Sequence, residues 1–532
     1  TRKYTGELGI IKRVESEPAK YTHEDEQFYK VHFESMLNYE RTFAEYHRLT
    51  GLLYYYMSSE QKIDKDLNDK DPSLQSMYAI PIRYQGLSGR ITYGLRDTYF
   101  LDLNFGYTGS ANFAKENRFG LFPAMAAGWV PTGYEWVREK MPWLDFLKIR
   151  GSYGMVGNDR LTNTRFPYLT LMKSGGGGGW GSSNGFITEE VIGADNLKWE
   201  VAKKVDIGVE AKLFGERLNF VVDIFRDKRD GIYQERQLIP EYAGLQKMPY
   251  GNVGKMVSYG SDGNISFTQR INKDMSFTLR GNFTYSANEV QNWEQAVQKY
   301  GYKDKAGYVN NAYRGYIALG LFRDEADIAA SPKQTFGDYL PGDIKYKDIN
   351  GDGVIDTNDE VPIGYSDIPE IVYGFGLSAN YKGFDLSLFF QGIANTTFFL
   401  GGAYFPFNYP NIGQTSFLAD LEGKFFDPEK QNFDAELPLL YSEGWHGSNY
   451  QNSTWWQRSG AFLRLKNAEI GYSLPKSVTE KLLLRSLRIF LSGENLLTFS
   501  PDIKYWDPET GSQDGRGYPL MRTVNLGLNI NF

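Results

Sequence analysis

The sequence contains no cysteine among its 532 residues, so disulfide bonds and thiol chemistry are excluded. It has no apolar run of the ~18 residues that a membrane-spanning helix needs, and the residues that follow Thr1 do not form an apolar signal segment. Its four histidines are scattered without metal-ligand spacing, at His23, His32, His47 and His446. The charges are scattered too, with a formal net charge of -7, so we expect no nucleic-acid partner.

Aromatic residues and glycine are abundant instead. Aromatics make up 16% of the chain, with 38 tyrosines and 35 phenylalanines, and there are 57 glycines. This mixture is typical of many strands, many tight turns and aromatic belts at a membrane interface. The chain is too long for one ordinary soluble core, yet no break in composition separates soluble domains. Its mean hydropathy of -0.46 does not argue against a membrane barrel, because half of each barrel strand is polar.

The final segment, Arg522–Phe532, has the clearest pattern in the chain. Val524, Leu526, Leu528 and Ile530 alternate with small or polar residues, and the segment ends on an aromatic. Strict alternation predicts a strand with one apolar and one polar face. For this strand alone, a soluble sandwich and a membrane barrel are equally good interpretations.

Similar strand patterns recur along the chain. About sixteen are long enough for a tilted membrane crossing of ~9–11 residues. They are predicted over residues 3–15, 28–43, 48–61, 82–95, 98–107, 119–130, 146–156, 197–213, 217–231, 253–271, 275–287, 370–381, 384–393, 462–472, 487–497 and 522–532. The apolar phase slips near Asn467, which predicts a β-bulge there.

Short and long connections alternate between these strands. The short turns are predicted at 44–47, 96–97, 214–216, 272–274 and 382–383. The long connections are predicted at 62–80, 157–197, 232–252, 288–369, 395–460 and 498–521. Outer-membrane barrels have short periplasmic turns and long outer loops, whereas a soluble β repeat has no reason to keep every insertion on one edge. The alternation therefore favours a membrane barrel.

Several motifs resemble the SusC/RagA-like TonB-dependent transporters. They are Arg118-Phe-Gly-Leu-Phe-Pro-Ala-Met-Ala-Ala-Gly-Trp129, Leu147-Lys-Ile-Arg-Gly-Ser-Tyr-Gly-Met-Val-Gly-Asn-Asp159, Asn196-Leu-Lys-Trp-Glu200, Pro341-Gly-Asp-Ile-Lys345 with Asp348-Ile-Asn-Gly-Asp-Gly353, and Gly493-Glu-Asn-Leu-Leu497. The combination is specific, and the resemblance runs from the first predicted strand to the last residue.

The resemblance implies an all-β, transmembrane antiparallel β-barrel in the bacterial outer membrane, of which residues 1–532 are the C-terminal ~16 of about 22 strands. It implies import of a large nutrient, an oligosaccharide or peptide, with a SusD-like surface lipoprotein as lid and energy from TonB. It also implies contact with membrane lipid and lipopolysaccharide, and a dimer of such pairs as one assembly. The chain departs from the family pattern at its start, where we find no plug domain and no TonB box. We interpret it as a C-terminal piece whose N-terminal barrel and plug segment lies on another chain or segment, or was lost.

The segment Asp348–Asp359 has the spacing of a calcium loop. Oxygen-bearing side chains stand at positions 1, 3, 5 and 12, a glycine at position 6 and an apolar residue at position 8. We therefore predict a structural Ca²⁺ site formed by Asp348, Asn350, Asp352, Val354, Asp356 and Asp359. Position 12 is Asp rather than Glu, and Glu360 is an alternative. The competing interpretation is an Asx-rich turn without an ion.

Aromatic residues in the predicted outer loops are candidate substrate-binding residues, since flat rings stack on sugars and clamp peptides. They are Trp445, Trp455, Trp456, Tyr505 and Trp506. Loop packing, the membrane interface and contact with a lipoprotein are the alternatives. The run Gly175–Gly179 has no following Lys-Ser/Thr and is interpreted as a flexible loop. Charged residues of the polar faces, such as Lys148 and Arg150, are interpreted as solvated wall, with a substrate path as the alternative.

Energy-coupled nutrient import is the function that these patterns favour. A barrel enzyme would need a Ser/His/Asp set, which four scattered histidines do not support, so no catalytic residue is predicted. A passive porin fits the missing plug but not the family motifs. The main alternative is a non-transporting scaffold subunit of a larger surface assembly, which would have the barrel but no energy-coupled transport.

Overall fold

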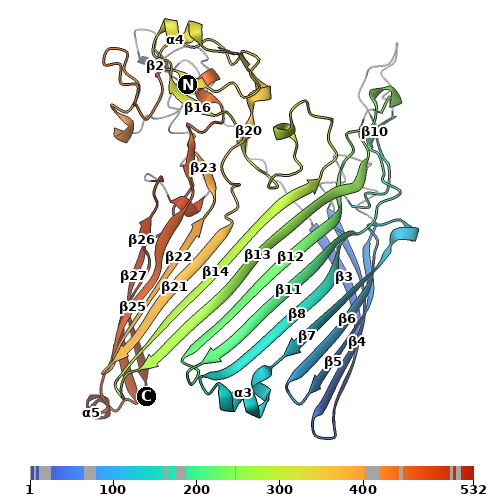
Figure 1. The fold of residues 1–532 in the computed structure, drawn as a ribbon, viewed down its shortest axis with the longest axis vertical. Coiled ribbons are helices and arrows are strands. Elements are labelled where there is room, and N and C mark those ends of the chain that lie inside the picture. Colours follow the sequence, from blue (N-terminus) through green and yellow to red (C-terminus); the bar gives the residue numbers. More distant parts are fainter. Residues whose placement is uncertain are drawn as a thin grey trace.

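The protein is dominated by one large antiparallel sheet (Figure 1). The computed structural model describes residues 2–4, 8–10, 26–64, 80–160, 165–174, 187–245, 247–401, 419–441, 447–503, 507–510 and 517–532. Within these residues, 15 strands pair in chain order, from β3 at one edge to β27 at the other. The sheet is the all-β architecture that the sequence predicts.

The strands of the large sheet are β3 (Glu26–Phe43), β4 (His47–Asp64), β5 (Ile82–Leu95), β6 (Tyr99–Ser110), β7 (Phe119–Trp129), β8 (Leu144–Asn158), β11 (Glu200–Leu213), β12 (Leu218–Glu235), β13 (Tyr250–Arg270), β14 (Met275–Asn292), β21 (Ile371–Tyr381), β22 (Phe384–Ala394), β25 (Phe462–Ser473), β26 (Ser486–Phe499) and β27 (Thr523–Asn531). Shorter strands lie in the connections: β9 (Leu171–Ser174), β10 (Ile187–Val191), β15 (Arg314–Gly315), β16 (Ala318–Leu321), β17 (Lys333–Gln334), β18 (Ile344–Tyr346), β19 (Val354–Ile355), β20 (Val361–Pro362), β23 (Thr397–Phe399) and β24 (Gln457–Ser459). The described helices are α3 (Glu135–Lys140), α4 (Glu325–Ala330) and α5 (Lys476–Thr479), with 3₁₀ turns η1 (Lys115–Asn117), η2 (Pro131–Gly133), η3 (Glu241–Ala243), η4 (Gly301–Lys303), η5 (Thr357–Asp359), η7 (Ala419–Leu421), η8 (Gly447–Tyr450), η9 (Glu480–Leu482) and η10 (Pro508–Thr510). No helix in these ranges is long and apolar enough to cross a membrane.

The two faces of the sheet differ in chemistry. On β6, Leu101, Leu103 and Phe105 share one face and pair across to Ala127, Met125 and Pro123 of β7. The opposite face of β6 carries Asp102 and Asn104, which pair with Thr92 and Arg90 of β5. The period-two alternation of the sequence thus becomes an apolar face and a polar face of one sheet.

Except at its lower edge, where α3 packs against it, the apolar face is largely uncovered by other described parts of the chain. Leu526 of β27 is 77% exposed, and Leu103 of β6 is 45% exposed. In a soluble sandwich these side chains would be buried against a second sheet. An uncovered apolar face on strand after strand is instead what a lipid-facing barrel wall requires. Residues on the polar face of β6 are less exposed than their apolar neighbours, which fits a sheet that curls with its polar face inward.

The connections divide between two edges of the sheet (Figure 1). The lower edge carries the tight hairpin turns, α3, α5 and the C-terminus, whereas β10, β16, β20, β23 and α4 lie at the upper edge. Positive φ angles at Arg96, Asp97 and Lys382 show the left-handed backbone that two-residue hairpins need. Large insertions and tight turns therefore lie at opposite edges.

Two local predictions about the strands have opposite outcomes. A bulge near Asn467 is confirmed, since the pairing register of β25 with β26 shifts between Leu465 and Asn467. A single barrel strand over residues 3–15 is wrong. The chain forms instead a separate two-stranded sheet of β1 (Arg2–Tyr4) and β2 (Leu8–Ile10). The polar triplet of residues 5–7 interrupts the apolar alternation there, so the segment lacks a continuous apolar face.

On the polar face, some ion pairs join residues of two strands that are separated by a third strand. The side chains meet over a glycine of that middle strand. Gly208 of β11 pairs with Arg150 of β8 on one side and with Asp223 of β12 on the other. Because glycine has no side chain, the Arg150 guanidinium passes over it and donates to Asp223 Oδ1 at 2.7 Å. A Cβ at Gly208 would lie 1.9 Å from that oxygen.

The same arrangement recurs near the C-terminal edge. Arg488 of β26 reaches over Gly471 of β25 to the carboxylate of Asp385 on β22, and it also donates to Glu469 at 2.5 Å. A Cβ at Gly471 would lie 2.5 Å from the Arg488 guanidinium. Each bridge joins side chains of two strands across a third strand that lies between them, in addition to the backbone ladder.

We predict that Gly208→Ala destabilises the sheet by about 1–3 kcal/mol, because the new methyl group must displace the Arg150–Asp223 pair. The measurement is the temperature at which the folded, compact form converts to the unfolded form on semi-native electrophoresis. Gly151→Ala is the matched control, since the nearest atom to its Cβ is the Asp206 carbonyl oxygen at 3.9 Å. Equal transition temperatures for the two variants would contradict the bridging role of Gly208.

Candidate functional site

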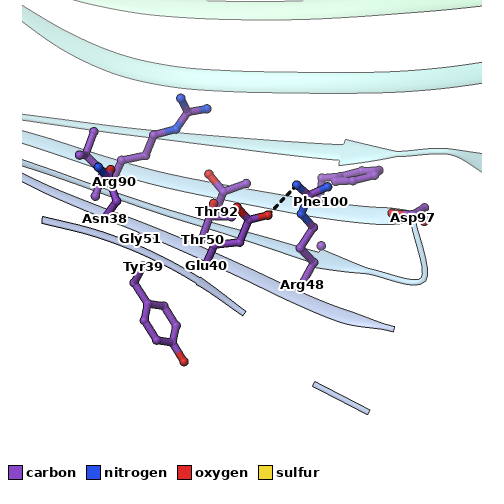
Figure 2. A pocket seen from close by; sticks show the side chains of 12 residues that line it. Asn38, Tyr39, Glu40, Arg48, Thr50, Gly51, Arg90, Thr92, Asp97 and Phe100 are labelled. Carbon is purple, nitrogen blue, oxygen red and sulfur yellow. Dashed lines mark hydrogen bonds and ion pairs between the residues drawn. The ribbon is translucent and has the colours of Figure 1, made fainter. Parts of the chain in front are cut away.

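The polar face of β3 to β6 has a hollow of about 690 Å³ (Figure 2). Glu40 of β3 and Arg48 of β4 form an ion pair beside it, with 2.9 Å between Oε1 and Nη2. Arg90 of β5 also lines it and donates through Nε to Asp102 Oδ2 at 2.9 Å. Hydroxyl and amide groups of Asn38, Thr50 and Thr92 line it as well. The Asp97 carboxylate and the Phe100 ring also belong to its lining.

The chemistry of this hollow is that of recognition rather than reaction. Each of its two arginines is paired with a carboxylate, and both guanidinium groups are exposed to solvent. Such a surface exchanges hydrogen bonds with a polar solute at little electrostatic cost, because its arginines keep their carboxylate partners. The alternation of β3 and β4 placed these residues on one face, but only the cross-strand register brings them together.

Charged residues near the upper end of β25 are paired as well. Arg464 of β25 is 1% exposed and donates to Asp507 at 2.5 Å, while Lys466 lies 3.3 Å from Glu509. Burial opposes ionisation of Asp507, but the hydrogen bonds from Arg464 and from backbone N–H groups, together with the Arg464 charge, outweigh it and lower the pKa of Asp507. Arg464 therefore fastens the β26–β27 connection to the sheet.

The upper edge carries a compact structure that we call the loop cap. It consists of the described residues of the β14–β21 connection (293–370) and of the β22–β25 connection (395–401, 419–441 and 447–461), with Ile503 from the β26–β27 connection. These connections share one apolar core, whose buried members are Tyr316, Leu321, Ile344, Tyr346, Ile355, Ile363, Phe398, Phe399, Leu400, Leu421, Phe426, Leu437, Trp456 and Ile503. The long insertions thus fold together rather than extending separately.

A buried carboxylate joins the two halves of the loop cap. Asp343 is fully buried and accepts hydrogen bonds from the Leu340 N–H at 2.8 Å, the Tyr441 hydroxyl at 2.6 Å and the Asn449 side-chain amide at 2.6 Å. Burial, and then the charge of Asp343, raise the pKa of the Tyr441 phenol, which stays neutral and remains a donor. Since Asp343 and Asn449 come from different connections, this network fixes one connection against the other.

The predicted substrate-binding aromatics divide into two groups. Trp445, Tyr505 and Trp506 lie outside the described residues. Trp456 is 3% exposed, packs in the core of the loop cap and donates its indole N–H to the Asn449 carbonyl at 2.8 Å. Trp455 is partly buried against the same core. Both rings have packing roles here, and their contact with a substrate stays a prediction.

The predicted calcium loop forms part of the loop cap. Each of its first oxygen-bearing side chains accepts a backbone N–H of the loop: Asp348 from Gly351 and Gly353, Asn350 from Asp352, and Asp352 from Val354. Gly351 and Gly353 have φ angles of 75° and 84°, so both require glycine. The sharp turn that the spacing predicts is therefore present.

The last position of that loop behaves differently. Asp359 is fully buried, and its two oxygens accept N–H groups of Ile349 at 2.8 Å and Asp356 at 2.9 Å. Within the described residues, no group of three or more His, Cys, Asp or Glu is placed to hold a metal ion. The hydrogen bonds are those of an Asx-rich turn, and they leave the Ca²⁺ ion a proposal.

Sequence reasoning did not identify the Asp343 network or the glycine-spanning ion pairs. The signal for the pairs was present, since Arg150 and Asp223 lie in predicted strands on either side of Gly208. Recognising it needs the register across three strands, which one sequence does not fix. The side chains that donate to Asp343 are about 100 residues away in the sequence, and no local pattern marks them.

Comparisons with known proteins agree with this geometry. The family model described as TonB dependent receptor-like, beta-barrel matches residues 9–496. TonB-dependent receptor P3 of Formosa agariphila is 27% identical over 474 residues, covering 84% of this chain and 45% of that protein. TonB-dependent receptor SusC of Bacteroides thetaiotaomicron is 26% identical over 475 residues, covering 86% and 44%.

Solved structures share the fold. The structure of the RagAB peptide transporter aligns with a TM-score of 0.70 at 20% identity, covering 96% of this chain and 56% of that chain. The RagAB peptide importer in its open-open state aligns with a TM-score of 0.71 at 21% identity, covering 97% and 56%. The chain spans about half the length of the curated relatives that it matches. It belongs to the TonB-dependent receptor-like β-barrel family, as a SusC/RagA-like member located in the bacterial outer membrane.

Proposed function

We propose that this chain forms the greater part of the wall and the outer loop cap of an importer for a large polar nutrient, an oligosaccharide or a peptide. The observation that carries the proposal is the polar face of the sheet, whose paired charges and hydrogen-bonding groups suit the passage of a polar solute. The similarity to SusC and to the RagAB peptide transporter supports the same proposal. Energy would come from TonB, and we expect no catalytic activity.

The proposed lid is a SusD-like lipoprotein that contacts the loop cap. Apolar side chains of the β14–β21 connection are exposed, with Val297 at 95%, Ile368 at 66% and Leu319 at 57%. Exposed apolar groups of this kind are stabilised when a partner buries them, by about 1.5–3 kcal/mol for each fully buried side chain. The alternative, a non-transporting scaffold subunit, would keep this contact but import nothing.

The partner proposal predicts a loss of binding when the loop cap is altered. Val297→Asp combined with Leu319→Asp should reduce lipoprotein recovery about tenfold or more when the intact protein is purified from its native membrane. The control is Leu482→Asp, at an exposed residue of the opposite edge, which should leave recovery unchanged. Equal recovery from all three proteins would contradict this contact surface.

Import itself is tested by uptake of labelled oligosaccharides and peptides into cells that carry or lack the intact protein. If the protein is an importer, uptake of at least one class should fall in the deletion strain. Uptake by cells that carry the protein should fall equally when an uncoupler removes the proton-motive force. If the protein is a scaffold, the deletion strain should keep its uptake but lose other surface proteins from the membrane. That result would contradict the transport proposal.

We also propose that Ca²⁺ binds the Asp348–Asp359 loop and braces the loop cap. Each oxygen of Asp348 accepts one N–H, so it keeps a lone pair for a cation. Burial raises the pKa of Tyr302, and the charges of Asp359, Asp352 and Asp348 raise it further, as expected beside a loop that gathers carboxylates. Oxygen ligands in such a field are those that Ca²⁺ prefers.

The calcium proposal predicts that Ca²⁺ raises the thermal transition of the loop cap and that EGTA reverses the effect. The double variant Asp348→Ala/Asp352→Ala should abolish this response. Asp324→Ala is a control, because Asp324 caps α4 in the same connection without belonging to the loop. A calcium response that is unchanged in the double variant would remove the proposal and leave the Asx-rich turn.

A further inference from the structure

The short helix α3 packs against the apolar face of the sheet at its lower edge (Figure 1). Its Val137 is 5% exposed and belongs to a buried cluster with Leu144 and Leu213. Leu147 of β8 and Phe220 of β12 pack against this cluster and both pair with Ala211 of β11, so they share one face. That face also carries Ile149, which is exposed like the other apolar wall residues. The helix therefore lies on the membrane-facing side of the wall.

A hollow of about 740 Å³ lies between α3 and the lower ends of β5 and β6, beside the β3–β4 turn. Aromatic rings form much of its wall, from Tyr46, Tyr99, Tyr134 and Trp136. The hydroxyl groups of Tyr99 and Tyr134 are hydrogen-bonded to each other, and the rings of Tyr134 and Trp136 stack with centroids 6.2 Å apart. Tyrosine and tryptophan are the residues that prefer the level of lipid headgroups.

Three charged side chains surround the same hollow. The Arg96 guanidinium lies 5.1 Å from the centroid of the Tyr46 ring, and the carboxylates belong to Glu135 and Glu139 of α3. Within the described part of the chain, none of the three forms an ion pair with another side chain. Lys140 lies over the Trp136 ring but does not line the hollow. One cation and two anions thus lie on an aromatic hollow beside the bilayer.

We propose that this hollow binds the headgroup of a phospholipid that carries both a phosphate and a primary ammonium group. Arg96 would contact the phosphate, and Glu135 and Glu139 would accept hydrogen bonds from the ammonium. The acyl chains would continue along the apolar face, past Leu101 and Leu103 of β6. A headgroup with a phosphate but no ammonium would meet two uncompensated carboxylates, so the site selects zwitterionic over anionic lipid.

The proposed lipid site is independent of what the protein transports. The site requires that the apolar face lies in the membrane, because the hollow adjoins the lower end of that face. The bound lipid would fix the depth of the wall in the bilayer, since the headgroup is held by residues of both the β5–β6 turn and α3.

The test uses the intact protein, purified from its native membrane and transferred to nanodiscs of equimolar phosphatidylethanolamine and phosphatidylglycerol. Native mass spectrometry then counts the lipids that remain bound after the disc is removed. We expect the wild type to retain phosphatidylethanolamine in about tenfold excess. Glu135→Gln/Glu139→Gln should abolish the excess, and Arg96→Gln should reduce retention of both lipids.

Matched controls change a charge at the same edge but away from the hollow. Lys273→Gln in the β13–β14 turn and Glu480→Gln beside α5 should behave as the wild type. Semi-native electrophoresis establishes that each variant is folded, and Glu139→Gln alone replaces the double variant if that protein does not fold. The proposal is overturned if the wild type retains no excess of phosphatidylethanolamine, as it would if a protein segment filled the hollow. It is also overturned if the folded hollow variants retain lipid as the controls do.

Discussion

Backbone hydrogen bonding inside the membrane is the constraint on which this structure depends. A bilayer offers no water to unpaired N–H and C=O groups, so every crossing strand must have a neighbour on each side. The ladder from β3 to β27 meets this requirement through its interior strands, and each of these pairs with the strands next to it in the sheet. The edges formed by β3 and β27 in the described residues are where the same constraint demands another partner.

Once the strands are paired, side-chain alternation assigns the two faces. The apolar side chains of β6 and β27 remain exposed because their partner is lipid, and the charged side chains of the other face pair with one another. Paired charges keep the polar wall close to neutral while leaving many hydrogen-bonding groups available. The bridges over Gly208 and Gly471 add connections across three strands that the backbone ladder does not provide.

The sequence predicts the elements that depend on local patterns. Strand positions, the bulge near Asn467 and the division between short and long connections all follow from period-two alternation and turn residues. The alternation within residues 3–15 is too short to establish which sheet these residues join. Contacts that require register or distant residues are not predictable in this way. The hydrogen bonds of Asp343 with Tyr441 and Asn449 are the clearest example. The packing of Trp456 is another, since an aromatic residue of an outer loop can equally well contact a ligand or pack in a core.

The central claim is that the apolar face of this sheet meets lipid while the opposite face meets water. Because the chain has no cysteine, single-cysteine variants can be labelled at one position each. Leu103→Cys and Leu526→Cys test the apolar face, and Asn104→Cys and Asn525→Cys test the polar face of the same strands. With a fluorescent label in the native membrane or in vesicles, brominated lipid should quench positions 103 and 526 but not 104 and 525. Quenching at all four positions, or at none of them, would contradict the account.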